Sequence, residues 1–330
     1  MLVTRVSGAL DLITQAGVVT PVSGLPAGAR PMDIKLDPGF AQNRRVFISF
    51  QEDDSAVPRI GRAKDEPGII PSGLALMTAT LSGAAGGEMS LTAVQVIWRQ
   101  TKVCSFAGSG EYGGRIALSP DGQSLFLAAG DRQEFEPVQK LDNTLGKIIR
   151  LRLDGSVPAD NPLISNAGAR PEIWSVGHRN PYGLLFASDG RLMSTEMGPL
   201  GGDEFNIIAA GKNYGWPLAS NGSHYSGDDI PDHVAGDGFE GPSASWSPVI
   251  APAGMIQYSG LLFPMWRDDI LVTGLASKAL IRVRVTGASA FEVERIGMGQ
   301  RIRDIEQSSD GALWIVEDGA SARLLRLTPA

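Results

Sequence analysis

The sequence predicts an all-β fold, a six-bladed β-propeller, from its glycine and proline content and from a hairpin pattern that recurs along the chain. The 330 residues include 41 glycines and 21 prolines, and long helical periodicities are few. This composition indicates many short strands joined by tight turns rather than helix bundles or alternating strands and helices. We expect the repeats to form one domain over residues 1–330.

The recurring pattern is an apolar alternating run, usually a turn of the Asp-Gly or Pro-Gly kind, and then a second apolar run. Asp-Gly supplies the positive φ that a tight hairpin turn needs, so the repeat has a physical cause. Five predicted hairpins follow the pattern, at 33–39 with 46–50, 116–122 with 125–127, 184–190, 261–263 with 270–272, and 305–311 with 313–316.

A further alternating strand follows several of these hairpins, at 147–153, 279–285 and 323–327. Short sheets that repeat at spacings of tens of residues are typical of a propeller, because a sandwich has no reason to repeat one signature. The first blade is incomplete in the sequence, since 1–4 and 9–14 resemble only the second half of a blade. Either the natural start lies earlier or the C-terminal strand helps to close the ring, and both interpretations stay open.

Charge and composition exclude several classes of partner. The net charge is -7, whereas proteins that neutralise phosphates need clustered Lys and Arg, so we expect no nucleic acid partner. No run approaches the roughly 20 consecutive apolar residues that span a bilayer, and no signal-peptide pattern follows Met1. We therefore expect no membrane partner either. The single cysteine, Cys104, excludes an internal disulfide and is expected to be a packing residue.

Five segments carry a resemblance to a known family, at 37–44, 146–162, 177–184, 196–206 and 211–217. They include the runs Gly-His-Arg-Asn-Pro, Gly-Pro-Leu-Gly-Gly-Asp-Glu and Gly-Lys-Asn-Tyr-Gly-Trp-Pro. From Asp33 onward the chain resembles the soluble glucose and aldose sugar dehydrogenases, six-bladed propellers that use pyrroloquinoline quinone (PQQ) and calcium. The resemblance implies a PQQ-dependent oxidoreductase with a small sugar as substrate and a periplasmic or secreted location.

The resemblance also implies a set of cofactor-binding residues. Transferred position by position, Arg179 and Asn180 would contact the quinone, an acid with three carboxylates that suits a planar bidentate cation. Arg301 and Arg303 would serve the same anion, because residues two apart lie on one face of a strand. Asp318 falls on another site position of the family.

The metal positions follow from the same transfer. Calcium is a hard cation that takes carboxylate and carbonyl oxygens, and a Gly-Pro turn near acidic residues offers both. The carbonyls that match Gly198 and Pro199 face the cofactor's calcium in the family, and the Glu204 carboxylate and Tyr214 carbonyl match a second, structural calcium. Without the resemblance, Glu204 would be interpreted as a solvated loop acid; with it, we expect calcium there.

The catalytic position departs from the family pattern. Oxidation of a sugar needs a base for the hydroxyl proton, and the family places a histidine four residues before an arginine. The corresponding residues here are Glu111 and Arg115, so Glu111 becomes the candidate base. The charge of Arg115 would lower the pKa of Glu111, and burial would raise it. Asp131 matches the acid that orients the histidine, so two carboxylates could share a proton.

Two further positions are changed relative to the family. Gly28 stands where the family has a glutamine near the quinone, and Ala276 replaces a lysine, with Lys278 two residues on. These changes keep open a second hypothesis, a propeller that binds calcium and a ligand or partner without catalysis. A third hypothesis, a lactonase-like hydrolase that uses calcium as a Lewis acid, has no matching motif. Of the three hypotheses, we favour sugar oxidation, because the five segments and the arginines support it.

Overall fold

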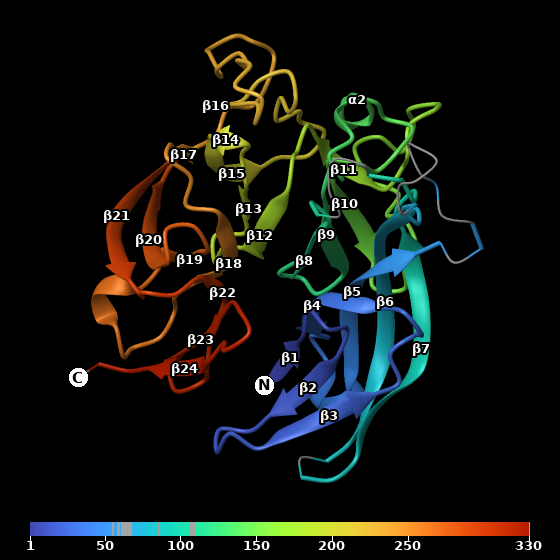
Figure 1. Ribbon diagram of the computed structural model, residues 1–330, viewed down its shortest axis with the longest axis vertical. Helices are drawn as coiled ribbons and strands as arrows, with labels where there is room; N and C mark the ends of the chain where they lie inside the picture. The colour runs from blue at the N-terminus through green and yellow to red at the C-terminus, as the bar shows by residue number, and fades with distance from the viewer. Residues whose placement is uncertain (55, 58–59, 61–67, 85, 106–109, 330) are drawn as a thin grey trace. The chain divides into compact units, whose positions relative to one another are not determined.

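The computed structural model describes residues 1–54, 56–57, 60, 68–84, 86–105 and 110–329. Within these ranges the chain is built almost entirely of strands (Figure 1). The chain divides into two compact units, Met1–Ile173 and Trp174–Ala330. The single domain that the sequence predicts over residues 1–330 stays a prediction.

The first unit holds two sheets. Its strands are β1 (Leu2–Thr4), β2 (Leu10–Ile13), β3 (Val19–Ser23), β4 (Arg30–Leu36), β5 (Arg45–Asp53), β6 (Ser72–Gly83), β7 (Met89–Arg99), β8 (Gly113–Leu118), β9 (Ser124–Ala129), β10 (Lys147–Arg152) and β11 (Ile173–Val176), in which the boundary between the units falls. The strand orders are β1-β2-β3-β7-β6-β5-β4 and β11-β10-β9-β8. The parallel pair in the larger sheet is β3 with β7, where Val22 faces Met89.

The second unit holds three main sheets and one short ribbon. Its strands are β12 (Pro181–Phe186), β13 (Leu192–Glu196), β14 (Leu200–Gly201), β15 (Asp203–Ile208), β16 (Gly222–Ser223), β17 (Ala244–Trp246), β18 (Pro252–Gln257), β19 (Ile270–Gly274), β20 (Ala279–Thr286), β21 (Ser289–Gly297), β22 (Ile302–Gln307), β23 (Leu313–Glu317) and β24 (Leu324–Leu327). The strand orders are β12-β13-β15-β17, β14-β16, β18-β19-β20-β21 and β22-β23-β24.

Helices are short in the part of the chain that the structure describes. They are α1 (Phe40–Asn43), α2 (Phe135–Val138) and the 3₁₀ helix η1 (Pro264–Trp266). Among the described residues, none of the helices has the length and apolar character needed to span a bilayer.

Three of the predicted Asp-Gly turns form for the expected reason. Gly122, Gly190 and Gly311 adopt φ values of 66°, 86° and 85°, a left-handed conformation that strains other residues. In each turn the aspartate just before the glycine accepts a hydrogen bond from the backbone N–H two residues after the aspartate. This side-chain bond is typical of Asx turns, so the Asp-Gly pair itself closes these hairpins.

The prediction for the fourth hairpin is wrong in its first strand. Residues 261–263 are not a strand, and β18 pairs with β19 instead. Leu261 is 77% exposed, whereas the Phe263 ring stacks on Trp266 with centroids 4.5 Å apart. The apolar run belongs to a loop that packs on Tyr258 and leads into η1, so its hydrophobicity reflects loop packing rather than a pleated strand.

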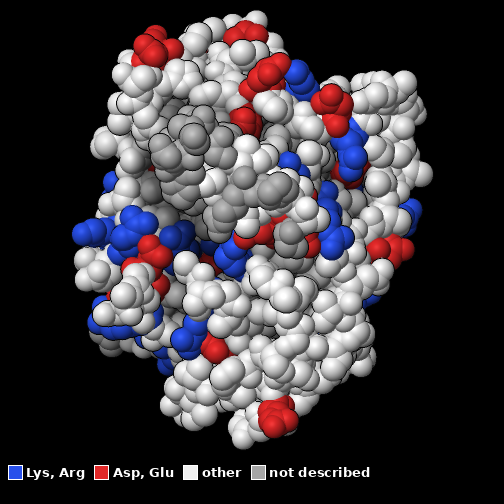
Figure 2. Space-filling model, turned by 45° about the vertical axis from the view of Figure 1, so that its right-hand side comes forward, with Lys and Arg blue, Asp and Glu red and all other residues white. Residues whose placement is uncertain are grey.

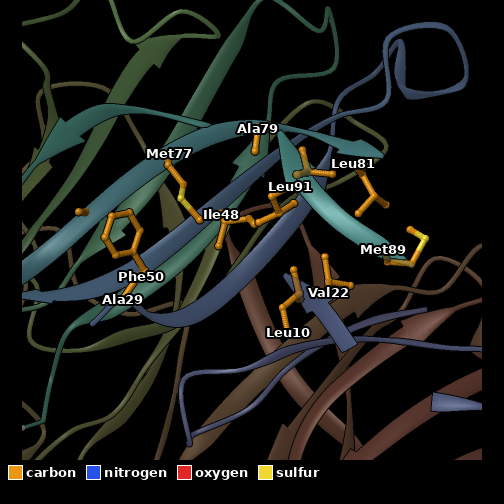
Figure 3. Close-up of a cluster of buried hydrophobic side chains, with 12 residues drawn as sticks. Leu10, Val22, Ala29, Ile48, Phe50, Met77, Ala79, Leu81, Met89 and Leu91 are labelled. Atoms are coloured by element: carbon orange, nitrogen blue, oxygen red, sulfur yellow. The ribbon is translucent and has the colours of Figure 1, made fainter. Parts of the chain in front are cut away.

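Alternate residues of the central strands pack into different hydrophobic clusters. In β5, Ile48 and Phe50 belong to the cluster of Figure 3, whereas Phe47 belongs to another. In the second unit, the neighbouring residues Val272 and Leu271 of β19 likewise belong to two different hydrophobic clusters. Because successive side chains of a strand point to opposite faces, these sheets are buried on both faces. Two-sided burial explains why such strands read as continuous hydrophobic runs.

Basic and acidic side chains lie beside one another on the face shown in Figure 2. Arg30 pairs with Asp53 at 2.7 Å, and Glu52 lies 2.9 Å from Arg99 and 3.1 Å from Lys102. Partly exposed ion pairs of this kind contribute at most about 1 kcal/mol each. These ion pairs therefore neutralise charge locally and add little to the free energy of unfolding.

We expect Ile48→Val to lower the free energy of unfolding by about 0.5–1.5 kcal/mol, because it removes one methylene from a fully buried site. Ile164→Val is the matched control, since Ile164 is 41% exposed and should change stability by less than about 0.5 kcal/mol. Urea unfolding of both variants checks this. Equal losses in the two variants would contradict the assignment of Ile48 to the core.

Candidate functional site

The carboxylate of Glu196, at the end of β13, organises the segment that carries Arg179 and Asn180. Its Oε2 accepts the backbone N–H of Arg179 at 2.8 Å, and its Oε1 lies 3.0 Å from Nδ1 of His178. Nε2 of His178 lies 2.8 Å from the Ser175 hydroxyl oxygen, so both ring nitrogens have hydrogen-bond partners. Glu196 and His178 are buried, which holds this segment in one conformation.

A second buried carboxylate lies directly opposite Glu196. Glu204 in β15 is its cross-strand partner, and the side-chain amide of Asn206 donates to both carboxylates at 3.0 and 2.9 Å. Burial, and then the charge of Glu196, raise the pKa of Glu204 well above its ordinary value. The amide oxygen of Asn206 is buried without a hydrogen-bond partner among the described residues. Two buried carboxylates joined by a neutral amide form an environment that favours a bound cation.

The turn that holds Gly198 and Pro199 is fixed by Asp203. Its Oδ1 accepts the N–H of Gly198 at 2.9 Å, and its Oδ2 accepts the N–H groups of Ile250 and Ala251 at 2.7 and 2.6 Å. Burial raises the pKa of Asp203 to about 6, against the lowering effect of these three donors. A Cβ at Gly198 would lie 2.3 Å from the Gly201 carbonyl oxygen, so only glycine fits this turn.

The guanidinium of Arg179 lies over this turn. Its Nη1 donates to the carbonyls of Met197 and Gly198, both at 2.9 Å. The guanidinium carbon is 5.4 Å from the Trp216 ring and 5.6 Å from the Tyr225 ring. Tyr214 stacks on His178 with ring centroids 4.8 Å apart. The resemblance implies one site for Arg179, Gly198 and Tyr214. These three residues are indeed neighbours within the second unit.

Arg301, Arg303 and Asp318 also lie together. Arg301 precedes β22 and Asp318 follows β23, its antiparallel partner, so the strand pairing joins them. Arg301 Nε and Arg303 Nη2 donate to the two Asp318 oxygens at 2.8 and 3.0 Å. Burial would raise the pKa of Asp318, but the Arg301 hydrogen bond and the Arg303 charge lower it below its ordinary value. The Arg303 guanidinium carbon lies 5.5 Å from the Tyr182 ring, two residues beyond Asn180.

This set of side chains fits an anionic planar cofactor. Two guanidinium groups that share one carboxylate keep a net positive charge, and Tyr182 offers an aromatic face. The set at Glu204 fits a cation, because the carboxylate and the Asn206 amide oxygen are hard oxygen donors. No group of three or more His, Cys, Asp or Glu side chains that could hold a metal ion occurs among the described residues. A calcium ion here would therefore need backbone carbonyl ligands as well.

The first unit brings the segments of Glu111 and Asp131 together. Glu111 precedes β8 and Asp131 follows β9, and the Arg132 N–H donates to the Glu111 carbonyl at 3.2 Å. Asp131 is fully buried, and its Oδ1 accepts the N–H of Gln133 at 2.8 Å. Glu111, Arg132 and Gln133 have positive φ values of 58°, 58° and 59°. Several non-glycine residues in this conformation mark a locally strained backbone, which is frequent at functional sites.

Arg115 and Arg132 differ in their surroundings. Arg115 lies on β8 with Nη1 3.8 Å from the Asp33 carboxylate. Arg132 is 1% exposed, stacks on the Tyr112 ring with its guanidinium carbon 3.5 Å from the centroid, and donates to Ser72 Oγ at 3.0 Å. Burial lowers the pKa of Arg132, while the charges of Tyr112, Asp131 and Glu111 act to raise it. Arg132, which sequence reasoning did not single out, is therefore a cation that interacts electrostatically with both carboxylates.

Gly28 and Ala276, the two further positions at which the resemblance implies a change, lie on turns. Gly28 has φ of 76° and nothing within 4 Å of a Cβ built on it. Ala276 and Lys278 are exposed in the turn between β19 and β20, and Lys278 adopts φ of 50°.

Four residues of the second unit were missed as site residues by sequence reasoning: His178, Glu196, Asn206 and His233. Glu196 and Asn206 lie within a quoted segment, at strand positions that alternate with apolar residues. A polar residue at a strand position that faces the core is unusual, and this signal could have identified Glu196 and Asn206 as site residues. His233 lies in a long loop and gave no such signal.

The chain is similar in sequence to known sugar dehydrogenases. Aldose sugar dehydrogenase YliI of Escherichia coli (strain K12) is 36% identical over 325 residues, which cover 95% of this chain and 82% of that protein. Quinoprotein glucose dehydrogenase B of Acinetobacter calcoaceticus is 37% identical over 284 residues, which cover 63% of this chain and 59% of that protein.

Solved structures of related proteins match the backbone of this chain over its whole length. A crystal structure of a glucose dehydrogenase matches with a TM-score of 0.88 at 36% identity, covering 100% of this chain and 93% of that chain. The apo form of the soluble aldose sugar dehydrogenase from Escherichia coli matches with a TM-score of 0.86 at 35% identity and the same coverage. The predicted fold class, an all-β propeller, is thereby confirmed. Residues 1–326 match the Glucose / Sorbosone dehydrogenase family, and the chain belongs to that family.

We expect Asp203→Asn to lower the free energy of unfolding by about 2–4 kcal/mol at pH 7.5, because an amide cannot accept all three backbone N–H groups and leaves one or two of them unpaired. Asp232→Asn is the control, since Asp232 is an exposed acid of the same unit. Denaturant unfolding measures both. A loss in Asp203→Asn no larger than in the control would contradict the role of Asp203 in fixing the turn.

Proposed function

We propose that this protein is a PQQ-dependent sugar dehydrogenase that oxidises an aldose. Its membership of the Glucose / Sorbosone dehydrogenase family supports a sugar as substrate. A relative at 37% identity is named as a quinoprotein. A Streptomyces coelicolor aldose sugar dehydrogenase solved in its PQQ-bound form shares the fold at 24% identity. The observation that carries the proposal is the sharing of one carboxylate, Asp318, by Arg301 and Arg303 beside the Tyr182 ring.

In this proposal Arg179, Asn180, Arg301 and Arg303 bind and orient the cofactor. PQQ, when bound, would supply the oxidation by taking up the hydride that leaves the sugar carbon. The guanidinium groups suit its carboxylates because a planar fork donates two parallel hydrogen bonds. Asp318 acts as a positioning residue, since it fixes both arginine side chains before the cofactor arrives. Preorganised donors of this kind bind an anion at a lower entropic cost.

Calcium is the proposed metal. The carbonyls of Gly198 and Pro199 would face the cofactor's ion, and the Glu204 carboxylate with the Tyr214 carbonyl would hold a second ion. Support comes from the buried, facing carboxylates of Glu204 and Glu196. The basic side chains beside them are two imidazoles, His178 at 3.0 Å from Glu196 and His233 at 3.7 Å from Glu204. We also propose a periplasmic or secreted location, by analogy with the resembled family.

Glu111 is the proposed general base. Its carboxylate would accept the proton of the sugar hydroxyl as the C–H bond breaks, while Asp131 and Arg132 set its charge. The approach of the two segments, through the bond from Arg132 N–H to the Glu111 carbonyl, supports this assignment. Arg132 adds support, because it interacts electrostatically with both Glu111 and Asp131.

We expect the purified protein to bind PQQ saturably in the presence of calcium, and an aldose to reduce the bound quinone. Arg303→Ala should weaken PQQ binding by about 10- to 100-fold, because a charge-assisted contact contributes about 1.5–3 kcal/mol. Arg326→Ala is the control, since Arg326 pairs with Asp310 on the partly exposed surface. Absorbance titration measures both steps. Binding without reduction by any aldose would favour the non-catalytic alternative, and no binding would refute the proposed cofactor.

We expect Glu111→Gln to lower kcat by about 10²–10⁴-fold, because a positioned general base contributes that much. Glu111→His should restore or raise activity, since an imidazole has a pKa near neutral pH. Steady-state kinetics with PQQ-loaded protein measures both variants. A Glu111→Gln variant that keeps nearly full activity would show that another residue removes the proton.

A further inference from the structure

The imidazole of His233 is buried beside Glu204, and its side chain is 6% exposed. Nδ1 lies 3.5 Å from the Asp237 carboxylate, whereas Nε2 is buried without a hydrogen-bond partner among the described residues. A buried polar atom left unpaired typically costs about 1–3 kcal/mol. Nε2 therefore points to a partner that the polypeptide does not itself provide.

The two nitrogens of His233 face two different carboxylates. Nε2 lies 3.7 Å from Glu204 Oε1, and Nδ1 lies 3.5 Å from Asp237 Oδ2. The first separation is too long for a hydrogen bond, but an ion about 2.0–2.2 Å from each atom spans it. A carboxylate behind the other ring nitrogen is the usual arrangement of a metal-binding histidine, because it fixes the tautomer and the ring orientation.

The backbone around Tyr214 places the ring against another proposed ligand. Gly215 has φ of 93°, and a Cβ there would lie 2.8 Å from His233 Cε1, so the imidazole packs on the Gly215 backbone. The peptide group that joins Tyr214 to Gly215 contains the Tyr214 carbonyl. The imidazole, the Glu204 carboxylate and this carbonyl thus belong to one small region of the second unit.

We propose that His233 is a metal ligand and that the cation site at Glu204 binds a borderline divalent transition metal more tightly than calcium. This inference rests on the proposed cation site at Glu204 and changes its specificity. Calcium takes oxygen ligands, whereas an imidazole nitrogen suits zinc, cobalt, nickel or copper. One imidazole, one carboxylate and one carbonyl, with solvent completing the shell, is a donor set of this mixed kind. The charge of a divalent ion also offsets the facing carboxylates of Glu196 and Glu204.

The test uses the full chain freed of metal, titrated separately with cobalt(II) and with calcium. Calorimetry gives both affinities, and the visible absorption of cobalt(II) reports ligation by an imidazole. We expect cobalt(II) to bind more tightly than calcium. His233→Gln should lose more than about 100-fold in cobalt affinity while calcium affinity changes little, because removing a ligand costs more than removing its supporting partner, which costs about 10- to 100-fold. His224→Gln is the matched control and should bind both ions as the unmodified protein does.

Asp237→Asn provides a second variant that leaves the imidazole in place. We expect it to weaken cobalt binding by about 10- to 100-fold, as loss of a supporting carboxylate does at other metal-binding histidines. Cobalt affinity unchanged in both His233→Gln and Asp237→Asn would overturn the inference. If Glu204→Gln still lost calcium binding in that case, the proposed cation site itself would stand. If neither ion bound and Glu204→Gln had no effect, the cation site would be wrong, and the inference with it.

Discussion

The candidate site of the second unit depends on one buried carboxylate, that of Glu196. It accepts hydrogen bonds from the His178 ring, the Arg179 backbone and the Asn206 amide. These three groups come from a loop and a strand that are well separated in sequence, and the one carboxylate fixes their relative positions. Because the bonds of a buried hydrogen-bond network depend on one another, loss of any one partner would weaken the others. The position of Arg179 follows from this network.

The same carboxylate links two kinds of binding chemistry. On one side it holds the segment of Arg179 and Asn180, which suits an anion; on the other it faces Glu204, which suits a cation. The neutral Asn206 amide lies between the two acids and donates to both, so the proposed anion-binding and cation-binding regions share one hydrogen-bond network.

Strand ends supply the functional residues, and two-sided sheets hold them in place. Glu196 ends β13, Asp318 follows β23 and Asp131 follows β9. The interiors of neighbouring strands are buried on both faces, which leaves them little freedom to shift. A site built on such ends gains its rigidity from hydrophobic packing, while the turns remain able to carry charged and strained residues such as Glu111.

Local physical rules were enough for part of this protein. The Asp-Gly turns at Gly122, Gly190 and Gly311 depend on residues close in sequence, and the sequence alone determined them. The sharing of Asp318 by Arg301 and Arg303 also needs the pairing of β22 with β23. The motifs also identified the family and the candidate arginines. The misassigned strand at 261–263 shows the limit, because loop packing and strand burial demand the same apolar residues.

The tertiary structure decided everything that depends on strand register and loop path. Glu196 faces Glu204 because β13 and β15 pair in one register, and a slip of either strand by one residue would turn that strand's side chains to the other face. His233 meets Glu204 only because a loop folds back over Gly215, whose lack of a side chain admits the ring. Long-range contacts of this kind leave no periodicity in the sequence, so physical reasoning from the sequence could not reach them.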